Sequence, residues 1–203
     1  MAAMPVADPL VWIDCEMTGL DLGADALIEI ACVVTDSDLN EVDAGLTVVI
    51  TPPAAALEQM GDFVRNMHVE SGLLDELAAG TTLADAQAQV MEYVRGHVAE
   101  GTRAPLCGSS VYVDRGFLAR DLPEFNDFLH YRVLDVSSFK EVIRRWYPKV
   151  YYASPDKHGG HRAMADIRES IAELRYYREA VLVPLPGPST SEAREIAAGH
   201  VIN

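Results

Sequence analysis

Asp14 and Glu16 stand one residue apart in the stretch VWIDCEMTGL, where an apolar run typical of a buried strand leads into two acids. In a strand, residues i and i+2 point to the same face, so these two carboxylates share a face and Cys15 points to the other. At a separation of about 5 Å and an effective dielectric constant of about 20, their repulsion is roughly 3 kcal/mol. A divalent cation would turn that repulsion into binding. The alternative is that the strand has ended and water solvates both acids.

Three further residues are candidates for the same site. Asp114 follows a later strand near the start of a helix, where it could also serve only to complement the helix dipole. His161 and Asp166 open the last strong helical pattern, in HRAMAD. They would lie about 140° apart if both were helical, so His161 reaches a shared site most easily from the loop or the first turn. The alternative for His161 is a structural or exposed histidine.

The elements that must position these residues follow from the apolar patterns. Apolar runs predict strands over 10–15, 26–36 and 45–51, and the short connections between them favour an antiparallel meander with the Asp14 strand at one side. Helical spacing follows from 56 to 99.

Strands and helices alternate in the second half of the chain. APLCG (104–108) and RVLDV (132–136) are expected to be parallel strands that each lead into a helix. The last helix is expected over about 161–180, with an apolar stripe that packs on the sheet. The predicted fold class is α/β, with a mixed five-stranded sheet made of a three-strand antiparallel meander plus two parallel strands, flanked by helices.

Length, charge and cysteine content limit the class of protein. We expect a single domain over 1–183, followed by a flexible tail, 184–203, that is rich in Pro, Ser and Gly and has at most a short helix. Sixteen basic against 31 acidic residues, a net charge of −15, argue against binding of long nucleic acid through a basic surface. Three cysteines give no disulfide or zinc pattern, and neither a secretory signal nor a membrane-spanning stretch is recognisable. We therefore expect a cytoplasmic protein.

The order of these residues resembles the DEDDh 3′–5′ exonucleases, which have the ribonuclease H-like fold. The four acids and the histidine of that family have matching positions here in D-x-E on a strand, one aspartate after a later strand, and H-x-x-x-x-D at a terminal helix. The resemblance extends to the oligoribonuclease branch over about residues 9–182, in WIDCEMTGL, MHVESGL, YRVLDVSSFKEVIRRW and HRAMADIRESIAELRYYR. One departure is the Val-Tyr-Val before Asp114, where relatives often have more polar residues.

The resemblance implies a site and a reaction. Two divalent cations, Mg²⁺ or Mn²⁺, would be held by Asp14, Glu16, Asp114 and Asp166, and His161 would be the general base for the attacking water. The implied reaction is release of 5′-mononucleotides from very short RNA, especially 5′-phosphorylated dinucleotides. Since the cations supply positive charge at the phosphate, so short a substrate needs no basic surface. The family also forms homodimers, which implies a homodimer here.

Further positions match the substrate contacts of the family. Leu20 resembles an apolar wedge that packs against the bases, and its alternative is an ordinary core leucine. His68 resembles a base-stacking residue, and its alternative is an exposed loop histidine. The residues that would hold the far phosphate and close the pocket are Ser110, Tyr131, Arg132 and Ser137. Tyr131 could come from the partner subunit.

Ser137 has a second interpretation, because it precedes a predicted helix. Ser138 with Glu141 would make a better capping box, which predicts that the Ser137 hydroxyl is available to a phosphate at the helix N-terminus. Arg132 could add a charge-assisted clamp, or it could be an ordinary surface arginine.

Two other functions stay open on the sequence. A proofreading-type DNA exonuclease shares the fold, the acids and the histidine, and the residues around Arg132 and Ser137, together with the lack of a polymerase-binding extension, favour the RNA enzyme. The second is a catalytically silent module that binds metal or nucleotide. The intact His161 argues against it, because metal retention alone requires no base.

Overall fold

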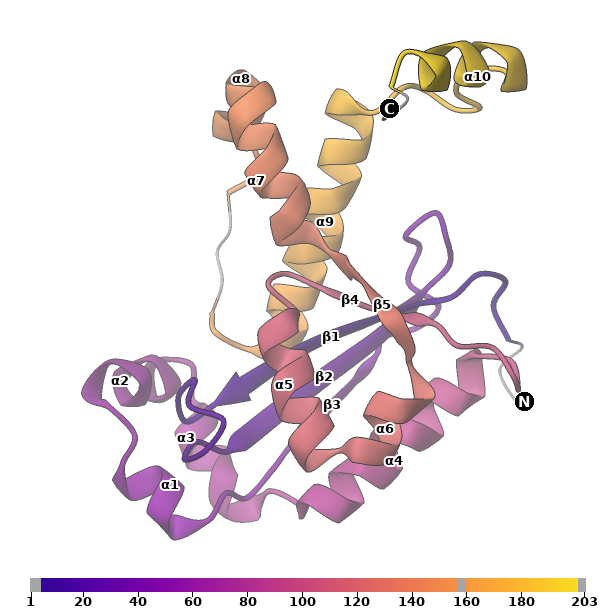
Figure 1. The fold of residues 1–203 in the computed structure, drawn as a ribbon. Coiled ribbons are helices and arrows are strands. Elements are labelled where there is room, and N and C mark those ends of the chain that lie inside the picture. The colour runs from indigo at the N-terminus through magenta and orange to yellow at the C-terminus, as the bar shows by residue number, and fades with distance from the viewer. Residues whose placement is uncertain (1–4, 157–159, 201–203) are drawn as a thin grey trace.

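The computed structural model describes residues 5–156 and 160–200. Residues 1–4, 157–159 and 201–203, which include the start of the expected domain and the end of the expected tail, lie outside the described residues. Within the described part, a five-stranded sheet with the order β3-β2-β1-β4-β5 forms the centre of the molecule (Figure 1). Its strands are β1 (Leu10–Met17), β2 (Leu27–Thr35), β3 (Leu46–Val49), β4 (Pro105–Gly108) and β5 (His130–Asp135).

The sheet is mixed, which confirms the predicted fold class. β2 is antiparallel to both β1 and β3, whereas β4 is parallel to β1 and β5 is parallel to β4. β1 continues to Met17, so Glu16 still belongs to the strand. The register places Glu16 directly opposite Glu29 and Asp14 opposite Ala31. Residues directly opposite each other in an antiparallel pair have side chains on the same face.

Helices cover both faces of this sheet. Their bounds are α1 (Ala54–Glu58), α2 (Asp62–Glu70), α3 (Leu73–Glu76), the 3₁₀ helix η1 (Leu77–Ala79), α4 (Leu83–His97), α5 (Tyr112–Asp121), α6 (Pro123–Phe128), α7 (Val136–Trp146), α8 (Pro148–Tyr152), α9 (Ala163–Val181) and α10 (Thr190–Ala198). One apolar core joins the sheet to α4, α5 and α6, and a second joins it to α7 and α9.

Alternation along β1 decides which core each side chain enters. Ile13 and Cys15 pack in the core on the α4 side, and Trp12 packs in the core on the α9 side. Because successive side chains alternate, Asp14 and Glu16 share the face of Trp12. The two acids therefore point to the side of the sheet that α9 covers.

α9 brings the C-terminal motif to that face. The expected apolar stripe is present, since Ile167, Ile171 and Leu174 are buried in the core that contains Trp12. The helix begins at Ala163 rather than at 161. His161 consequently lies in the loop just before the helix, which is one of the two positions, loop or first turn, that its spacing from Asp166 favoured.

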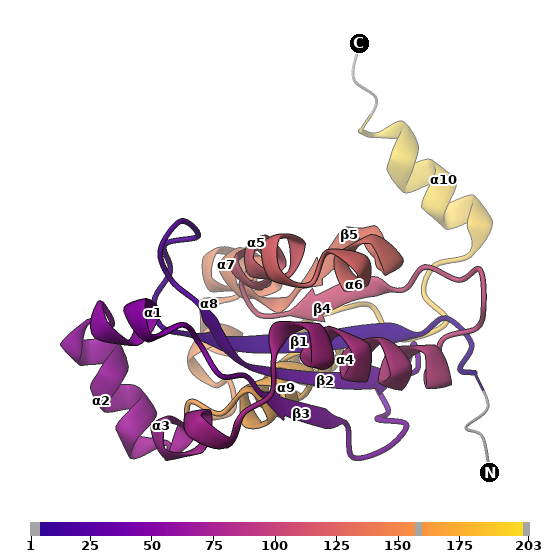
Figure 2. The same cartoon turned by 90° about the horizontal axis from the view of Figure 1, so that it is seen from below.

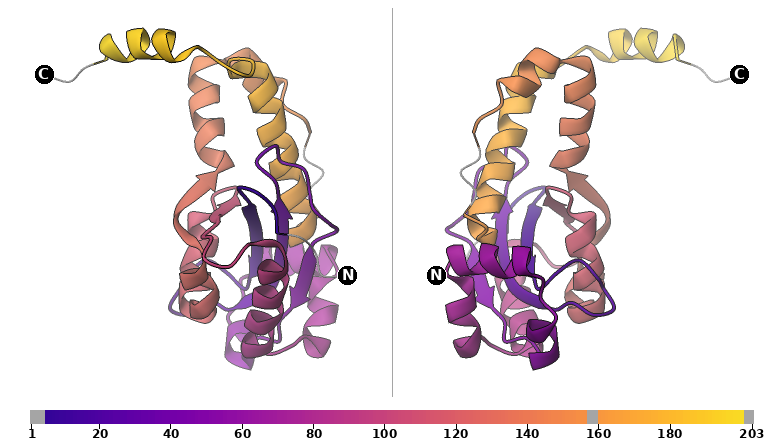
Figure 3. Two further views of the ribbon diagram at one scale, coloured as in Figure 1. Left: turned by 90° about the vertical axis from the view of Figure 1, so that its right-hand side faces the viewer. Right: turned by 90° about the vertical axis from the view of Figure 1, so that its left-hand side faces the viewer.

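The C-terminal part of the structure extends away from the sheet. α7 and α9 contact each other and project beyond the sheet, and α10 lies at the far end of this projection (Figure 3). Figure 2 shows α10 standing apart from the other helices, and its residues are exposed rather than buried. Among the described residues, no helix has both the length and the apolar composition that crossing a bilayer requires.

Candidate active site

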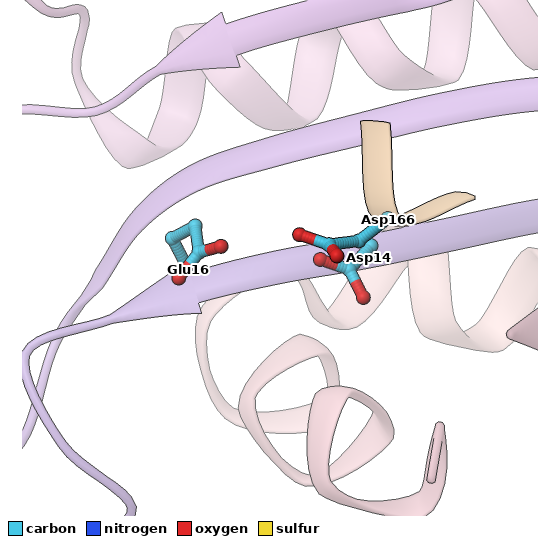
Figure 4. A group of neighbouring side chains, drawn as sticks. All are labelled: Asp14, Glu16 and Asp166. Carbon is cyan, nitrogen blue, oxygen red and sulfur yellow. The ribbon is translucent and has the colours of Figure 1, made fainter. Parts of the chain in front are cut away.

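Three acids from distant parts of the chain meet on the α9 face of the sheet. Asp14 and Glu16 project from β1, and Asp166 projects from the first turn of α9 (Figure 4). Each carboxylate offers one oxygen, and these three oxygens all lie within 4.8 Å of one another. Clustered carboxylate oxygens are the donor set that hard divalent cations such as Mg²⁺ and Mn²⁺ take.

The electrostatics of this cluster also favour a cation. Burial, and then the charges of Asp114 and Asp166, raises the pKa of the Asp14 carboxyl well above its usual range. Burial, followed by the charges of Asp166 and Glu29, raises the pKa of Glu16 to about 8. Like charges this close disfavour ionisation of one another, and a bound cation reverses that effect. The residues present therefore fit a divalent metal.

Asp114 lies next to the cluster but is held in a different way. It is on the first turn of α5 and is only 6% exposed. Its Oδ1 accepts a hydrogen bond of 2.9 Å from the backbone N–H of Cys15, which fixes it to β1 between Asp14 and Glu16. Burial raises the pKa of Asp114 to about 6. Asp114 is thus beside the three clustered oxygens without being one of the three.

His161 is exposed in the loop that leads into α9. Its backbone φ of 48° is in the left-handed region, which a residue with a Cβ rarely adopts. The two residues after it are firmly held, because both Arg162 and the backbone N–H of Ala163 bind the carboxylate of Glu29. The sequence interpretation missed Glu29, although a lone acid within the apolar stretch ALIEIACVV was a visible signal.

Leu20 is not a core leucine, since its side chain is 73% exposed in the loop between β1 and β2. Hydrogen bonds to Asp25 hold this loop in place. The Thr18 hydroxyl donates to the Asp25 carboxylate at 2.9 Å, and the backbone N–H of Asp21 donates to the same carboxylate at 2.9 Å. A Cβ at Gly19 would come within 2.3 Å of that carboxylate, so a larger residue there would displace Asp25 from these hydrogen bonds. The loop therefore presents Leu20 on a fixed backbone.

His68 is fully buried on α2, and not on an exposed loop as the alternative interpretation had it. Its Nε2 donates to the carbonyl of Met17 at 2.9 Å. Its Nδ1 has no hydrogen-bond partner among the described residues and lies 4.0 Å from a carboxylate oxygen of Glu16. The ring is thus beside the cluster, but in this conformation it offers no open face to a base.

The predicted capping box at α7 is wrong. The N-cap is Asp135, whose Oδ1 accepts hydrogen bonds from the backbone N–H of Ser137 at 2.9 Å and from its hydroxyl at 2.6 Å. Glu141 instead pairs with Arg144 at 3.3 Å. Asp135 caps because β5 ends there and leaves its side chain beside the free N–H groups of the helix. The Ser137 hydroxyl is consequently engaged rather than available.

The remaining phosphate candidates fall into two groups. Ser110 joins Ser137, because its backbone N–H donates to Asp135 at 2.9 Å and to the Ser137 hydroxyl at 3.2 Å. Tyr131 and Arg132 lie in the first half of β5, whereas Ser137 follows the end of that strand. Both are exposed, and the guanidinium of Arg132 lies over the Tyr131 ring, 5.5 Å from its centroid.

Comparison with known proteins agrees with the fold. A family model described as an exonuclease matches residues 11–174. The structure is similar to that of exonuclease I from Methylocaldum szegediense, with a TM-score of 0.60 and 21% identity over 86% of this chain and 41% of that chain. This chain thus spans about two fifths of the length of that solved structure. The fold is that of a ribonuclease H-like exonuclease.

Sequence relatives narrow the assignment. The chain is 66% identical over 195 residues to an oligoribonuclease of Streptomyces avermitilis, covering 96% of this chain and 98% of the relative. It is 65% identical over 191 residues to an oligoribonuclease of Streptomyces griseus, covering 94% and 95%. The chain belongs to the exonuclease family, in its oligoribonuclease branch. Exonucleases with this fold depend on divalent metal, and a cluster of carboxylates is present here.

Proposed function

We propose that this exonuclease works from the 3′ end of very short RNA, in particular 5′-phosphorylated dinucleotides, and releases 5′-mononucleotides. The observation that carries the proposal is the meeting of the Asp14, Glu16 and Asp166 carboxylate oxygens within 4.8 Å. RNA as the substrate is supported by the two Streptomyces relatives, both named oligoribonucleases, which match nearly the whole chain.

The acids hold two divalent cations, Mg²⁺ or Mn²⁺, in this proposal. The clustered oxygens come from Asp14, Glu16 and Asp166. Asp114 contributes a carboxylate oxygen from the side that faces β1. When bound, such cations lower the pKa of a water molecule and stabilise charge at the reacting phosphate. His161 accepts the proton of the attacking water, and the exposure of its ring leaves it accessible to that water.

Substrate binding is assigned to the rim of the cluster. Leu20 packs against the bases, since it is exposed and its loop is fastened. Ser110 and Ser137 stand at the N-terminus of α7, where backbone N–H groups favour a phosphate. For Ser137 this role requires its hydroxyl to turn away from Asp135. Stacking of His68 on a base likewise stays a prediction that requires a change from the buried position of its ring.

A homodimer through β5 and α7 is the proposed assembly. β5 is at the edge of the sheet and exposes Tyr131 (74%) and Val133 (42%), and Trp146 at the end of α7 is 71% exposed. Large apolar side chains beside an open strand edge are typical of a surface that a partner covers. In such a dimer, Tyr131 and Arg132 could reach the site of the partner subunit. Trp146→Glu should then shift the molecular mass measured by light scattering from dimer to monomer.

Expectations about the domain, the tail and the cellular location accompany this assignment. Residues 1–183 form the single catalytic domain, residues 184–203 form a tail that catalysis does not need, and the enzyme acts in the cytoplasm. The exposure of every α10 residue supports the division. Removal of 184–203 should leave dinucleotide cleavage unchanged.

Cleavage of 5′-labelled RNAs of two to ten residues, with Mg²⁺ or Mn²⁺, tests the function. The dinucleotide should be cleaved fastest and should yield 5′-mononucleotides. Equal rates at all lengths would contradict the substrate assignment. Matched DNA oligonucleotides test the alternative, a proofreading-type DNA exonuclease, which predicts DNA cleavage at least as fast as RNA cleavage. A protein that binds Mn²⁺ but cleaves neither would be the catalytically silent module.

A further inference from the structure

We propose that Glu29 and Arg162 are positioning residues that hold His161 and Asp166 against the acids of β1. This inference rests on the function proposed above, because that function gives His161 and Asp166 their roles. Neither Glu29 nor Arg162 belongs to the cluster of carboxylate oxygens. Both act on the short segment that connects the loop of His161 to α9.

Glu29 is a further acid on the face of the site, but it is not available as a metal ligand. It lies on β2 directly opposite Glu16 and is fully buried. Its Oε1 accepts hydrogen bonds from the Arg162 guanidinium, at 3.1 Å from Nε and 2.8 Å from Nη2. Its Oε2 accepts the backbone N–H of Ala163 at 2.9 Å. Both oxygens are therefore already bound.

This arrangement explains how a carboxylate can remain at 0% exposure among other acids. A buried charge is tolerated only when it is paired and its remaining lone pairs are satisfied. Arg162 supplies two charge-assisted hydrogen bonds, and the N-terminus of α9 supplies a backbone N–H and the positive end of its dipole. Removing either partner would leave an unpaired group in the interior.

The same contacts determine the backbone around His161. A residue with a Cβ at φ 48° is held in a costly conformation, which persists only where the surroundings fix it. Glu29 fixes the two residues that follow, Arg162 through its side chain and Ala163 through its backbone. The left-handed residue His161 thus directly precedes two residues that are bound to β2.

Asp166 takes its position from the same anchor. The carbonyl of Arg162 accepts the backbone N–H of Asp166 at 3.2 Å, so the first turn of α9 begins at the anchored residue. The other end of the Arg162 guanidinium binds Glu76 near the end of α3, 2.8 Å from Nη1. One guanidinium therefore joins β2 and α3, which a lysine ammonium cannot reproduce with the same fork of donors.

Glu29→Gln and Arg162→Lys test the inference, with Glu41→Gln as a matched control. Glu41 pairs with Arg168 of α9 at 3.3 Å, so the control removes a similar ion pair, between α9 and the segment after β2. The readouts are Mn²⁺ affinity by calorimetric titration without substrate, and kcat and KM for a 5′-phosphorylated dinucleotide. Circular dichroism establishes that each variant is folded.

Both test variants should bind Mn²⁺ about 10-fold more weakly and lose at least about 10-fold in kcat, which is the usual scale for residues that orient metal ligands. KM should change little, because Leu20, Ser110 and Ser137 belong to other elements. Glu41→Gln should match the wild type in all three quantities. Wild-type Mn²⁺ affinity and kcat in folded Glu29→Gln and Arg162→Lys would overturn the inference.

Two further outcomes are decisive. If Glu29→Gln does not fold, Arg162→Lys, whose side chain is one-third exposed, decides alone by the same criterion. If the wild type cleaves no RNA while both variants bind Mn²⁺ more weakly than Glu41→Gln, the proposed function fails and the positioning of Asp166 stands.

Discussion

Replacing Glu16 by Gln should stabilise the protein in the absence of metal while it removes activity. The pKa of Glu16 is raised to about 8 from an ordinary value of 4.5. For an acid with a raised pKa, the stability contribution is fully present below pH 4.5 and is lost as the pH rises through 8, because the unfolded chain gives up the proton more readily. This loss of folding stability amounts to about 3 kcal/mol at pH 7 and about 1 kcal/mol at pH 5.5. A glutamine at position 16 is neutral, so it avoids this loss of stability at every pH.

Thermal unfolding in EDTA, followed by circular dichroism at several pH values between 5.5 and 8, measures this effect. At pH 7 the unfolding free energy of Glu16→Gln should exceed that of the wild type by up to about 3 kcal/mol, roughly 6–12 °C in Tm for a chain of this size. The gap should widen as the pH rises, and Mg²⁺ should narrow it by stabilising only the wild type. Glu58→Gln, at an exposed position of α1, is the control and should change neither curve.

A Glu16→Gln protein less stable than the wild type at pH 7 in EDTA would show that the carboxylate contributes more through its contacts than it costs through burial and repulsion. A gap that stays constant with pH would show that titration of Glu16 is not its source.

Four further predictions concern single residues. Asp14→Asn should lower the dinucleotide cleavage rate at least about 100-fold with the circular dichroism spectrum retained; a smaller loss would remove Asp14 from the metal site. His161→Ala should lower kcat by about 10²–10⁴-fold and leave Mn²⁺ affinity unchanged in calorimetry, because the ring accepts a proton and holds no cation. Leu20→Ala should raise KM severalfold without moving Tm, since the side chain is 73% exposed. Asp135→Ala should lower the unfolding free energy in urea by about 1–2 kcal/mol, because it removes the cap of α7.

Strand periodicity accounts for what the sequence could predict about the site. The two-residue alternation in VWIDCEM places Asp14 and Glu16 on one face, and the apolar stripe of the last helix brings Asp166 to that face. The spacing of His161 from Asp166 similarly predicted a position in the loop or the first helical turn, and the structure places it in the loop. These are local patterns, so they do not depend on how distant segments pack.

Contacts between distant segments account for what the sequence could not show. The partner of Glu29 is 133 residues away, so the acid in ALIEIACVV gave no sign of which group pairs with it. The burial of His68 depends on how α2 sits against the end of β1. At α7, Asp135, Ser137 and Ser138 all have side chains that can cap a helix, and the choice of Asp135 depends on where the pairing of β5 with β4 ends.

The division of the acid cluster between β1 and α9 has a consequence during synthesis of the protein. The ribosome makes Asp14 and Glu16 among the first residues and Asp166 near the end, and a chain folds from its N-terminus as it emerges. Until α9 has been made and has docked on the sheet, the nascent chain contains only part of the cluster. The metal-binding cluster is therefore complete only after α9 has been synthesised and has docked, which makes the last helix the element that switches the site on.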